Sequence, residues 1–158
     1  MAEGFRADQI GSLLRPAEVK EARRAFSAGN IDRDQLTEIE DKAILKALDR
    51  QKQTGIDIFS DGEFRRASFQ NDVANSVEGY TESDSPAVLR IWQGPGSGQP
   101  EQQNTTQVVT GKLRQVRRLT EAQTSFLKTH SPGPFKITLP TPNQFPAISY
   151  KKGVTDKF

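Results

Sequence analysis

The stretch that decides the fold class is residues 55–66, which read Gly-Ile-Asp-Ile-Phe-Ser-Asp-Gly-Glu-Phe-Arg-Arg. Ile56, Ile58 and Phe59 predict a short buried strand, because β-branched and aromatic side chains favour that conformation. The strand ends in an Asp-Gly-Glu cluster at residues 61–63. In parallel α/β architectures, ligand sites form where strands end, at their carboxyl edge. This cluster is therefore a first candidate functional site.

A helix is predicted immediately before this strand. Asp32 and Gln35 have the spacing of a capping box, and Gly55 can supply the left-handed residue that ends a helix. Between them, apolar residues recur at spacings of three and four and form one face: Leu36, Ile39, Ala43, Ile44, Ala47 and Leu48. A second helix is predicted over residues 17–28, which lie between a proline and a glycine.

The same periodicities predict the remaining elements. Further strands are expected within residues 5–14, at Thr105–Leu113 and at Phe135–Leu139. A short helix is indicated by three side chains that recur every four residues, Phe69, Val73 and Val77. A longer one is expected over Glu121–His130, capped by Thr120, with Ala122 and Phe126 facing inward.

These elements define the expected fold class. About four strands alternate with helices, which favours parallel strands joined by right-handed crossovers, in an α/β sheet or barrel. Residues 81–104 are rich in Gly and Pro and are expected to form a long flexible loop. The length of 158 residues is typical of one domain.

Composition excludes several classes of protein. The chain has no Cys, so disulfides, thiolate nucleophiles and Cys-rich zinc sites are excluded, and it has a single His. No apolar run is long enough to span a bilayer, and no aromatic platform of the kind that binds single-stranded nucleic acid is present. We therefore expect a cytoplasmic protein with neither a membrane nor a nucleic acid as partner.

Three predicted strand ends carry polar groups that could bind a small molecule: residues 10–12, 61–63 and 138–143. Gly11 would let a ligand approach the backbone beside Ser12, and Glu63 could hold an ammonium group. The alternative is structural: Gly11 and Gly62 only make turns, and Asp61 caps the next helix. Spacing alone favours the structural interpretation. The basic run at residues 111–118 is similarly explained by an exposed strand end.

Four segments together resemble one known family. They are residues 6–16, 39–44, 55–66 and 138–142, whose order and spacing extend over nearly the whole chain. The family is the C-terminal-like domain of cobalamin-independent methionine synthase. The resemblance implies a (β/α)8 barrel that transfers a methyl group from a methyltetrahydrofolate-type donor to homocysteine. With this resemblance, the functional interpretation of residues 10–12 and 61–63 is favoured over the structural one.

The resemblance also implies roles for individual residues. Ile10, Gly11 and Ser12 would bind the carboxylate end of a homocysteine-like amino acid, and Glu63 would bind its ammonium. Backbone amides and a hydroxyl suit an anion, and a carboxylate suits a cation. The family's reaction also needs zinc, held by a His, two Cys and a Glu on later strands.

This sequence departs from that pattern because it contains no Cys. We therefore expect residues 1–158 to form an incomplete single barrel domain, the N-terminal half of a (β/α)8 barrel. It would be a fragment of a homocysteine S-methyltransferase of methionine biosynthesis, with no catalytic or metal-binding residues of its own and no activity alone. The alternative is a non-catalytic binding or assembly module that self-associates through exposed sheet edges.

Overall fold

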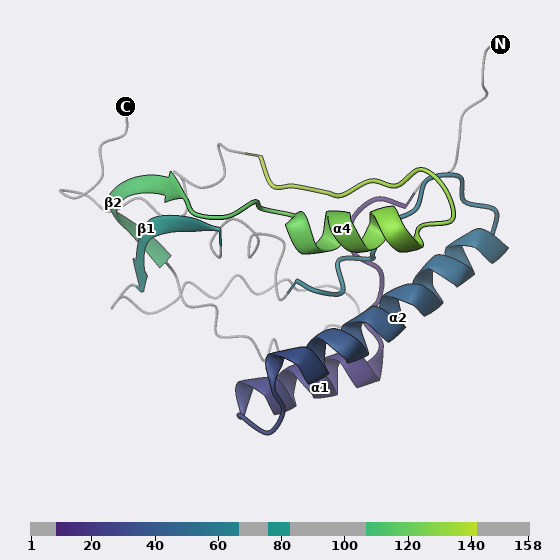
Figure 1. The fold of residues 1–158 in the computed structure, drawn as a ribbon, viewed down its shortest axis with the longest axis horizontal. Helices are drawn as coiled ribbons and strands as arrows, with labels where there is room; N and C mark the ends of the chain where they lie inside the picture. Colours follow the sequence, from purple (N-terminus) through teal and green to yellow (C-terminus); the bar gives the residue numbers. More distant parts are fainter. Residues whose placement is uncertain (1–8, 67–75, 83–106, 142–158) are drawn as a thin grey trace, which may run out of the picture. The chain divides into compact units, whose positions relative to one another are not determined.

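The computed structural model describes residues 9–66, 76–82 and 107–141 (Figure 1). It contains helices α1 (Ala17–Ser27), α2 (Arg33–Gln53) and α4 (Glu121–His130), and strands β1 (Val77–Glu82) and β2 (Gln107–Gln115). The described residues fall into two compact units. The first holds the three helices and the segments around the 61–63 cluster, and the second holds β1 and β2.

Helices α1 and α2 form where the sequence predicts them. Asp32 caps α2 by accepting from the amide of Gln35 at 2.8 Å, and the Gln35 side chain accepts from the Asp32 amide at 2.9 Å. This reciprocal pair is the expected capping box. Gly55 follows α2 with a φ of 78°, the left-handed conformation that ends many helices.

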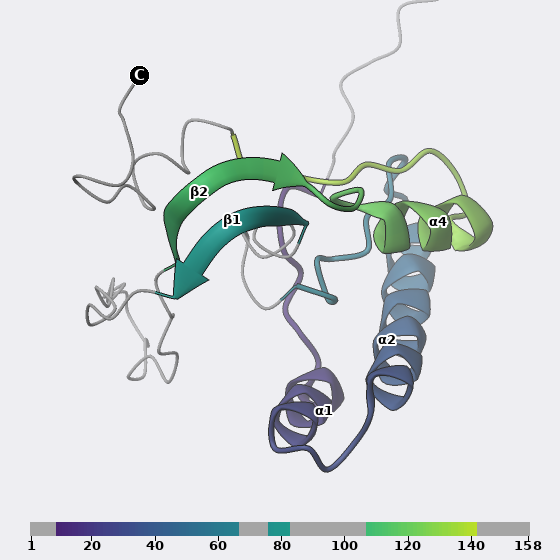
Figure 2. The ribbon, with the colours of Figure 1, turned by 60° about the vertical axis from the view of Figure 1, so that its left-hand side comes forward.

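The core of the first unit is assembled from all three helices and the segment after α2. Helix α4 lies alongside the C-terminal half of α2 (Figures 1 and 2). It contributes Leu127, which is fully buried, whereas Ala122, expected to face inward, is exposed. The side chains that make up this cluster are Val19, Ala43, Ile44, Leu48, Phe59, Phe64 and Leu127.

The predicted buried strand at 56–59 is present only as an isolated bridge. Phe59 pairs in parallel with Phe135, accepting from Lys136 N at 2.9 Å and donating to Pro134 O at 2.9 Å. The expected parallel direction is right at this point, but neither 56–59 nor 135–139 is an extended strand.

The side chain of Gln51 explains why the backbone pairing with the 134–136 segment does not continue past Phe59. The Gln51 amide donates to Ser60 O at 2.9 Å and accepts from Ser60 N at 3.0 Å. It satisfies the backbone groups that a neighbouring strand would otherwise bind. Residues 9–14 form no strand either, and residues 5–8 lie outside the described part of the chain.

The second unit corrects the predicted topology. Strand β2 overlaps the predicted strand Thr105–Leu113, of which residues 105 and 106 lie outside the described part of the chain. It pairs with β1 in antiparallel register, Val77 opposite Gln115 and Glu82 opposite Gln107. In the described residues the sheet is thus two-stranded and antiparallel, not four-stranded and parallel. The fold shown is mixed α/β.

The helix and loop predicted around β1 are also corrected. Val77, expected in a helix, begins β1, and Thr81 and Glu82, expected in the loop, end it. A bulge between Glu78 and Tyr80 lets Gly79 adopt a φ of 103°, and a Cβ there would lie 2.9 Å from Lys112 O. Phe69, Val73 and the loop residues 83–104 lie outside the described residues.

None of the helices in the described part of the chain has the length and hydropathy of a membrane-spanning segment.

Candidate functional site

The structure brings Ser12 and Glu63 together across 51 positions of sequence. The Ser12 hydroxyl donates to Glu63 Oε2 at 2.5 Å. A backbone hydrogen bond from Leu13 N to Gly62 O, at 3.1 Å, holds the two segments side by side. Two of the predicted polar segments therefore meet at one carboxylate, and Glu63 is only 5% exposed.

A third segment completes the surroundings of this carboxylate. The Thr138 hydroxyl donates to Glu63 Oε1 at 2.5 Å, and Arg66 Nη1 donates to the same hydroxyl at 3.2 Å. Arg66 Nη1 also lies 3.7 Å from Oε1. Glu63 is thus held by two hydroxyls and one guanidinium. Because such donors favour an ionised carboxylate, the site is built to keep a negative charge.

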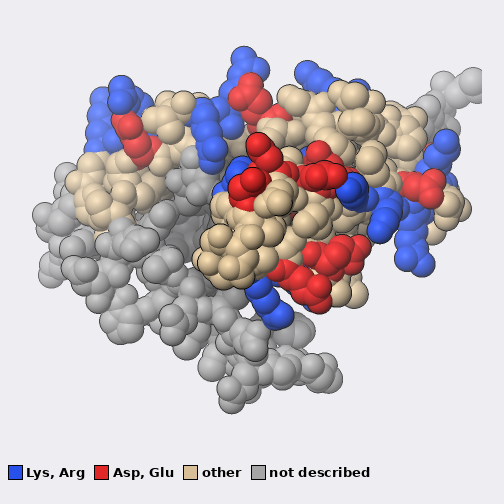
Figure 3. All heavy atoms as spheres, turned by 60° about the horizontal axis from the view of Figure 1, so that its bottom comes forward, with Lys and Arg blue, Asp and Glu red and all other residues tan. Residues whose placement is uncertain are grey.

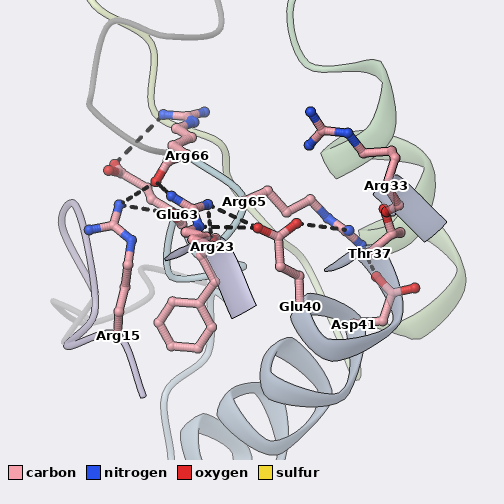
Figure 4. Close-up of polar contacts among 10 residues, drawn as sticks. Arg15, Arg23, Arg33, Thr37, Glu40, Asp41, Glu63, Arg65 and Arg66 are labelled. Atoms are coloured by element: carbon pink, nitrogen blue, oxygen red, sulfur yellow. Dashed lines mark hydrogen bonds and ion pairs between the residues drawn. The ribbon is translucent and has the colours of Figure 1, made fainter. Parts of the chain in front are cut away.

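Arginine side chains fix the backbone of the turn that carries Glu63. Arg15 donates to the carbonyls of Glu63 and Arg66 at 3.1 and 2.8 Å, and Arg23 donates to those of Phe64 and Arg66, both at 2.5 Å. Glu63 has a φ of 57°, a left-handed conformation that costs a non-glycine residue about 1–2 kcal/mol. The arginines help to offset this cost, and they gather around the turn in Figure 4.

Behind the turn, Arg23 belongs to a wider ion-pair network. Glu40 of α2 lies between Arg23, at 3.0 Å, and Arg65, at 3.9 Å, and Arg65 also binds Asp41 (Figure 4). Burial raises the pKa of Glu40, and Arg23, Arg65 and Arg33 offset only part of that effect. This network ties α1 and α2 to the site.

The charge state of the site follows from its surroundings. Burial raises the pKa of Glu63, but the hydroxyls of Ser12 and Thr138 and the charges of Arg66 and Arg15 outweigh it, so its pKa lies below the usual value. Burial also raises the pKa of the neighbouring Asp61, which the amide of Glu63 and nearby arginines offset only in part. At neutral pH, Glu63 is therefore an anion that suits an ammonium group.

The residues expected to bind the carboxylate of an amino acid are placed as follows. Ser12 lies at Glu63 and is itself exposed. Gly11 has a φ of 78°, and a Cβ there would meet no atom within 4 Å. Ile10 is 83% exposed. The segment thus has open space around it at Gly11.

Sequence reasoning assigned no role to Thr138, Arg15 or Arg23. Thr138 begins the third polar strand end that the sequence singles out, the same kind of position as Ser12 and Glu63, but the sequence gives it no partner. Arg23 lies one helical turn after buried Val19, on the same face of α1. This position on an apolar face was the signal that Arg23 points toward the interior.

Other charged candidates are exposed. Residues 111–118 on and after β2 are all exposed, and Arg114 is paired with Glu78 across the ribbon. The face drawn in Figure 3 carries acidic and basic side chains next to one another. Exposed mixed charge is typical of a solvated surface.

The residues of this chain do not fit a zinc centre of the kind that the family resemblance implies. Such a centre takes Cys thiolates, and the sequence has none. Within the described ranges, no three residues among His, Cys, Asp and Glu are grouped to hold a metal ion. His130 instead packs against Phe126, with ring centroids 4.4 Å apart.

Comparison with known proteins places the chain in a family. Residues 5–123 match the family described as cobalamin-independent synthase, catalytic domain. The chain is 34% identical to YxjH of Bacillus subtilis, covering 96% of this chain and 39% of that protein. It is 26% identical to a methionine synthase of Sulfolobus acidocaldarius, covering 90% of this chain and 40% of that protein.

Solved structures show the same relationship. A protein of Listeria monocytogenes, assigned as a vitamin-B12-independent methionine synthase, matches with a TM-score of 0.67 and 25% identity over 92% of this chain and 39% of that chain. The chain spans about two fifths of the length of these relatives. On its sequence and its fold together, the chain belongs to the family of cobalamin-independent methionine synthase catalytic domains.

Proposed function

We propose that the site around Glu63 binds the amino-acid end of homocysteine in a homocysteine S-methyltransferase. Glu63 pairs with the ammonium, and the Ile10–Ser12 segment receives the carboxylate through its backbone and the Ser12 hydroxyl. One observation carries this proposal: the buried Glu63 carboxylate lies 2.5 Å from the Ser12 hydroxyl. An anion and a hydroxyl at hydrogen-bond distance match the two charged ends of an α-amino acid.

The proposal assigns the chemistry to the whole family protein. Relatives named as 5-methyltetrahydropteroyltriglutamate–homocysteine methyltransferases support a methylated folate as donor and homocysteine as acceptor. Zinc, in the full-length family, would hold the acceptor sulfur as a thiolate. Because this chain has no Cys to hold zinc, it binds the amino acid without transferring a methyl group. A cytoplasmic location is part of the same proposal.

Calorimetric titration with L-methionine, a stable amino acid with the same ammonium and carboxylate, tests the binding. We expect Glu63→Gln to weaken binding by about 10- to 100-fold, since a charged hydrogen bond contributes ~1.5–3 kcal/mol. Glu21→Gln, at an exposed position of α1, is the matched control and leaves binding unchanged. 4-(Methylthio)butanoate, which lacks the ammonium, should bind the wild type and Glu63→Gln equally. Equal methionine affinity in the Glu63→Gln chain would contradict the proposal.

The absence of methyl transfer is tested separately. The purified chain is incubated with zinc, homocysteine and a methyltetrahydrofolate donor, and methionine is measured by mass spectrometry. We expect none above background, and its formation would overturn this part of the proposal.

A second candidate function is an assembly module, and the exposure of large apolar side chains favours it. Leu14 is 89% exposed and Ile10 is 83% exposed. Isolated exposed apolar residues are common, so this candidate function requires these two side chains to belong to one contact surface. Light scattering after size exclusion tests this function: a dimer that Leu14→Ser converts to a monomer supports it, and a wild-type monomer argues against it.

A further inference from the structure

The two oxygens of the Glu63 carboxylate receive hydroxyl groups from different parts of the chain. Ser12 donates to Oε2 and Thr138 donates to Oε1, each at 2.5 Å. Although these contacts have the same length, the two hydroxyls are held differently. Ser12 is exposed, whereas Thr138 is half-buried.

The direction of the Thr138 hydroxyl is fixed by Arg66. Arg66 Nη1 lies 3.2 Å from Thr138 Oγ1, and a guanidinium can only donate. Thr138 must therefore accept from Arg66, and its single proton is left for Glu63 Oε1. The Ser12 hydroxyl has no such second partner among the described contacts, so it can rotate away from Oε2.

Thr138 also separates two opposite charges. The direct distance from Arg66 Nη1 to Glu63 Oε1 is 3.7 Å, longer than either hydrogen bond through the Thr138 hydroxyl. The hydroxyl thus occupies the position in which Arg66 would bind the carboxylate directly. A direct pair would compete with a cationic ligand for the same negative charge.

We infer that Thr138 is a positioning residue that holds Oε1 of Glu63 and reserves Oε2 for the ammonium group of an amino acid. Ser12 is the exchangeable donor: its hydroxyl leaves Oε2 when the ligand arrives and turns to the ligand's carboxylate. This inference rests on the proposed function for the ligand, but the unequal roles of the two hydroxyls belong to the ligand-free chain. It gives Thr138 a role in a site for which the family resemblance implies Ile10, Gly11, Ser12 and Glu63 as binding residues.

The first test needs no ligand. Glu63 is titrated by carbon NMR in chain labelled at the Glu carboxyl carbon, with Glu63→Gln used to assign its signal. Among the described residues, the charged groups that act on Glu63 are Arg15, Arg66 and Asp61, and none of the Thr138 or Thr129 variants replaces them. Thr138→Val keeps the volume of the side chain and removes the hydroxyl, so the proton affinity of Glu63 should rise about three- to tenfold.

Two variants separate this effect from a general disturbance. Thr138→Ser restores the hydroxyl and should return the titration to that of the wild type. Thr129→Val removes an exposed hydroxyl on α4 that binds the carbonyl of Ser125, and it should leave Glu63 unchanged. Thr138→Ala serves as a second hydroxyl-free variant in case the valine does not fold. A Glu63 titration that is the same in the hydroxyl-free variant and the wild type overturns the inference.

The second test measures L-methionine affinity between pH 4 and 8. Thr138→Val should bind about tenfold more weakly, and its loss of affinity on acidification should begin at higher pH, whereas Thr138→Ser should follow the wild type. A wild-type chain that binds no methionine, but whose Glu63 titration depends on Thr138, would refute the proposed function and uphold the fixed hydroxyl. A wild-type chain that binds methionine with the same pH profile as Thr138→Val would refute the inference alone.

Discussion

At the scale of single residues, the site depends on two consecutive left-handed positions. Gly62 and Glu63 have φ values of 64° and 57°. The turn they form directs the Glu63 carboxylate toward Ser12 and Thr138, and the side chain of Asp61 supports it by accepting from Glu63 N at 3.0 Å. Gly62 has a further constraint: a Cβ there would lie 3.0 Å from Leu13 Cδ1 and 3.1 Å from Phe64 Cε1.

Gly62→Ala should therefore destabilise the chain more than the same change at Gly55. Both positions are left-handed, which costs an alanine about 1–2 kcal/mol, but a Cβ at Gly55 would meet nothing within 4 Å. The contacts at Gly62 should add roughly 1–3 kcal/mol of overpacking. Urea unfolding of the two variants measures the difference in the free energy of unfolding. Equal losses of stability would show that the Leu13 side chain moves aside without cost.

The sequence identifies part of the site at this scale. Ser12 and Glu63 were expected to act on one ligand, and the structure places them in contact, although their roles remain a proposal. The strand end at Thr138 was singled out without a role, because a sequence shows that a hydroxyl exists, but not which acceptor it faces. That direction depends on Arg66, whose guanidinium approaches from the turn after Glu63.

At the scale of elements, local signals predicted α1, α2, α4 and the approximate position of β2, but not β1 or the direction in which the strands pair. The capping box of α2 involves residues three positions apart, and α1 and α4 are likewise bounded within a few residues. A strand needs a partner that its own sequence does not specify. At Ser60 the partner is the Gln51 side chain, and at β1 it is an antiparallel strand.

Asp32→Ala should destabilise the chain by about 1 kcal/mol, because it removes the carboxylate that accepts from the amide of Gln35 and caps α2. Thr120→Ala is the matched control at the start of α4. Thr120 makes no side-chain capping bond, and its hydroxyl contacts that of Thr124 instead. Removal of the Thr120 hydroxyl should lower the free energy of unfolding by less than half as much as Asp32→Ala does. Thermal unfolding followed by circular dichroism compares the two, and a larger loss at Thr120 would contradict this account.

At the scale of the whole molecule, buried charged side chains hold helices together, a role that apolar side chains usually have. The side chains of Arg23 and Glu40 are 20% and 6% exposed, and together they link α1, α2 and the turn after Glu63. The hydropathy pattern gives no sign of this link, since it treats both residues as polar. Family membership was predictable because it rests on several ordered segments and not on any one contact.

Arg23→Met should cost about 3–5 kcal/mol, since it leaves Glu40 buried beside one distant arginine and removes donors from two carbonyls. Arg33→Met is the control on α2. Arg33 is exposed and lies over the Phe26 ring at 4.1 Å, so its loss should cost about 1 kcal/mol or less. Denaturant midpoints of the two variants test this difference, and similar losses would mean that the network adds no stability.

The contact between Glu63 and Thr138 also has a consequence for biosynthesis on the ribosome. The two residues are 75 positions apart, so the carboxylate leaves the ribosome well before its fixed hydroxyl partner. At typical elongation rates of 5–20 residues per second, this interval is roughly 4–15 s. Throughout that time the nascent chain contains the residues of α1, α2 and Glu63 but lacks the hydroxyl of Thr138. A chaperone that shields this intermediate would act before Leu127 and Thr138 have been translated.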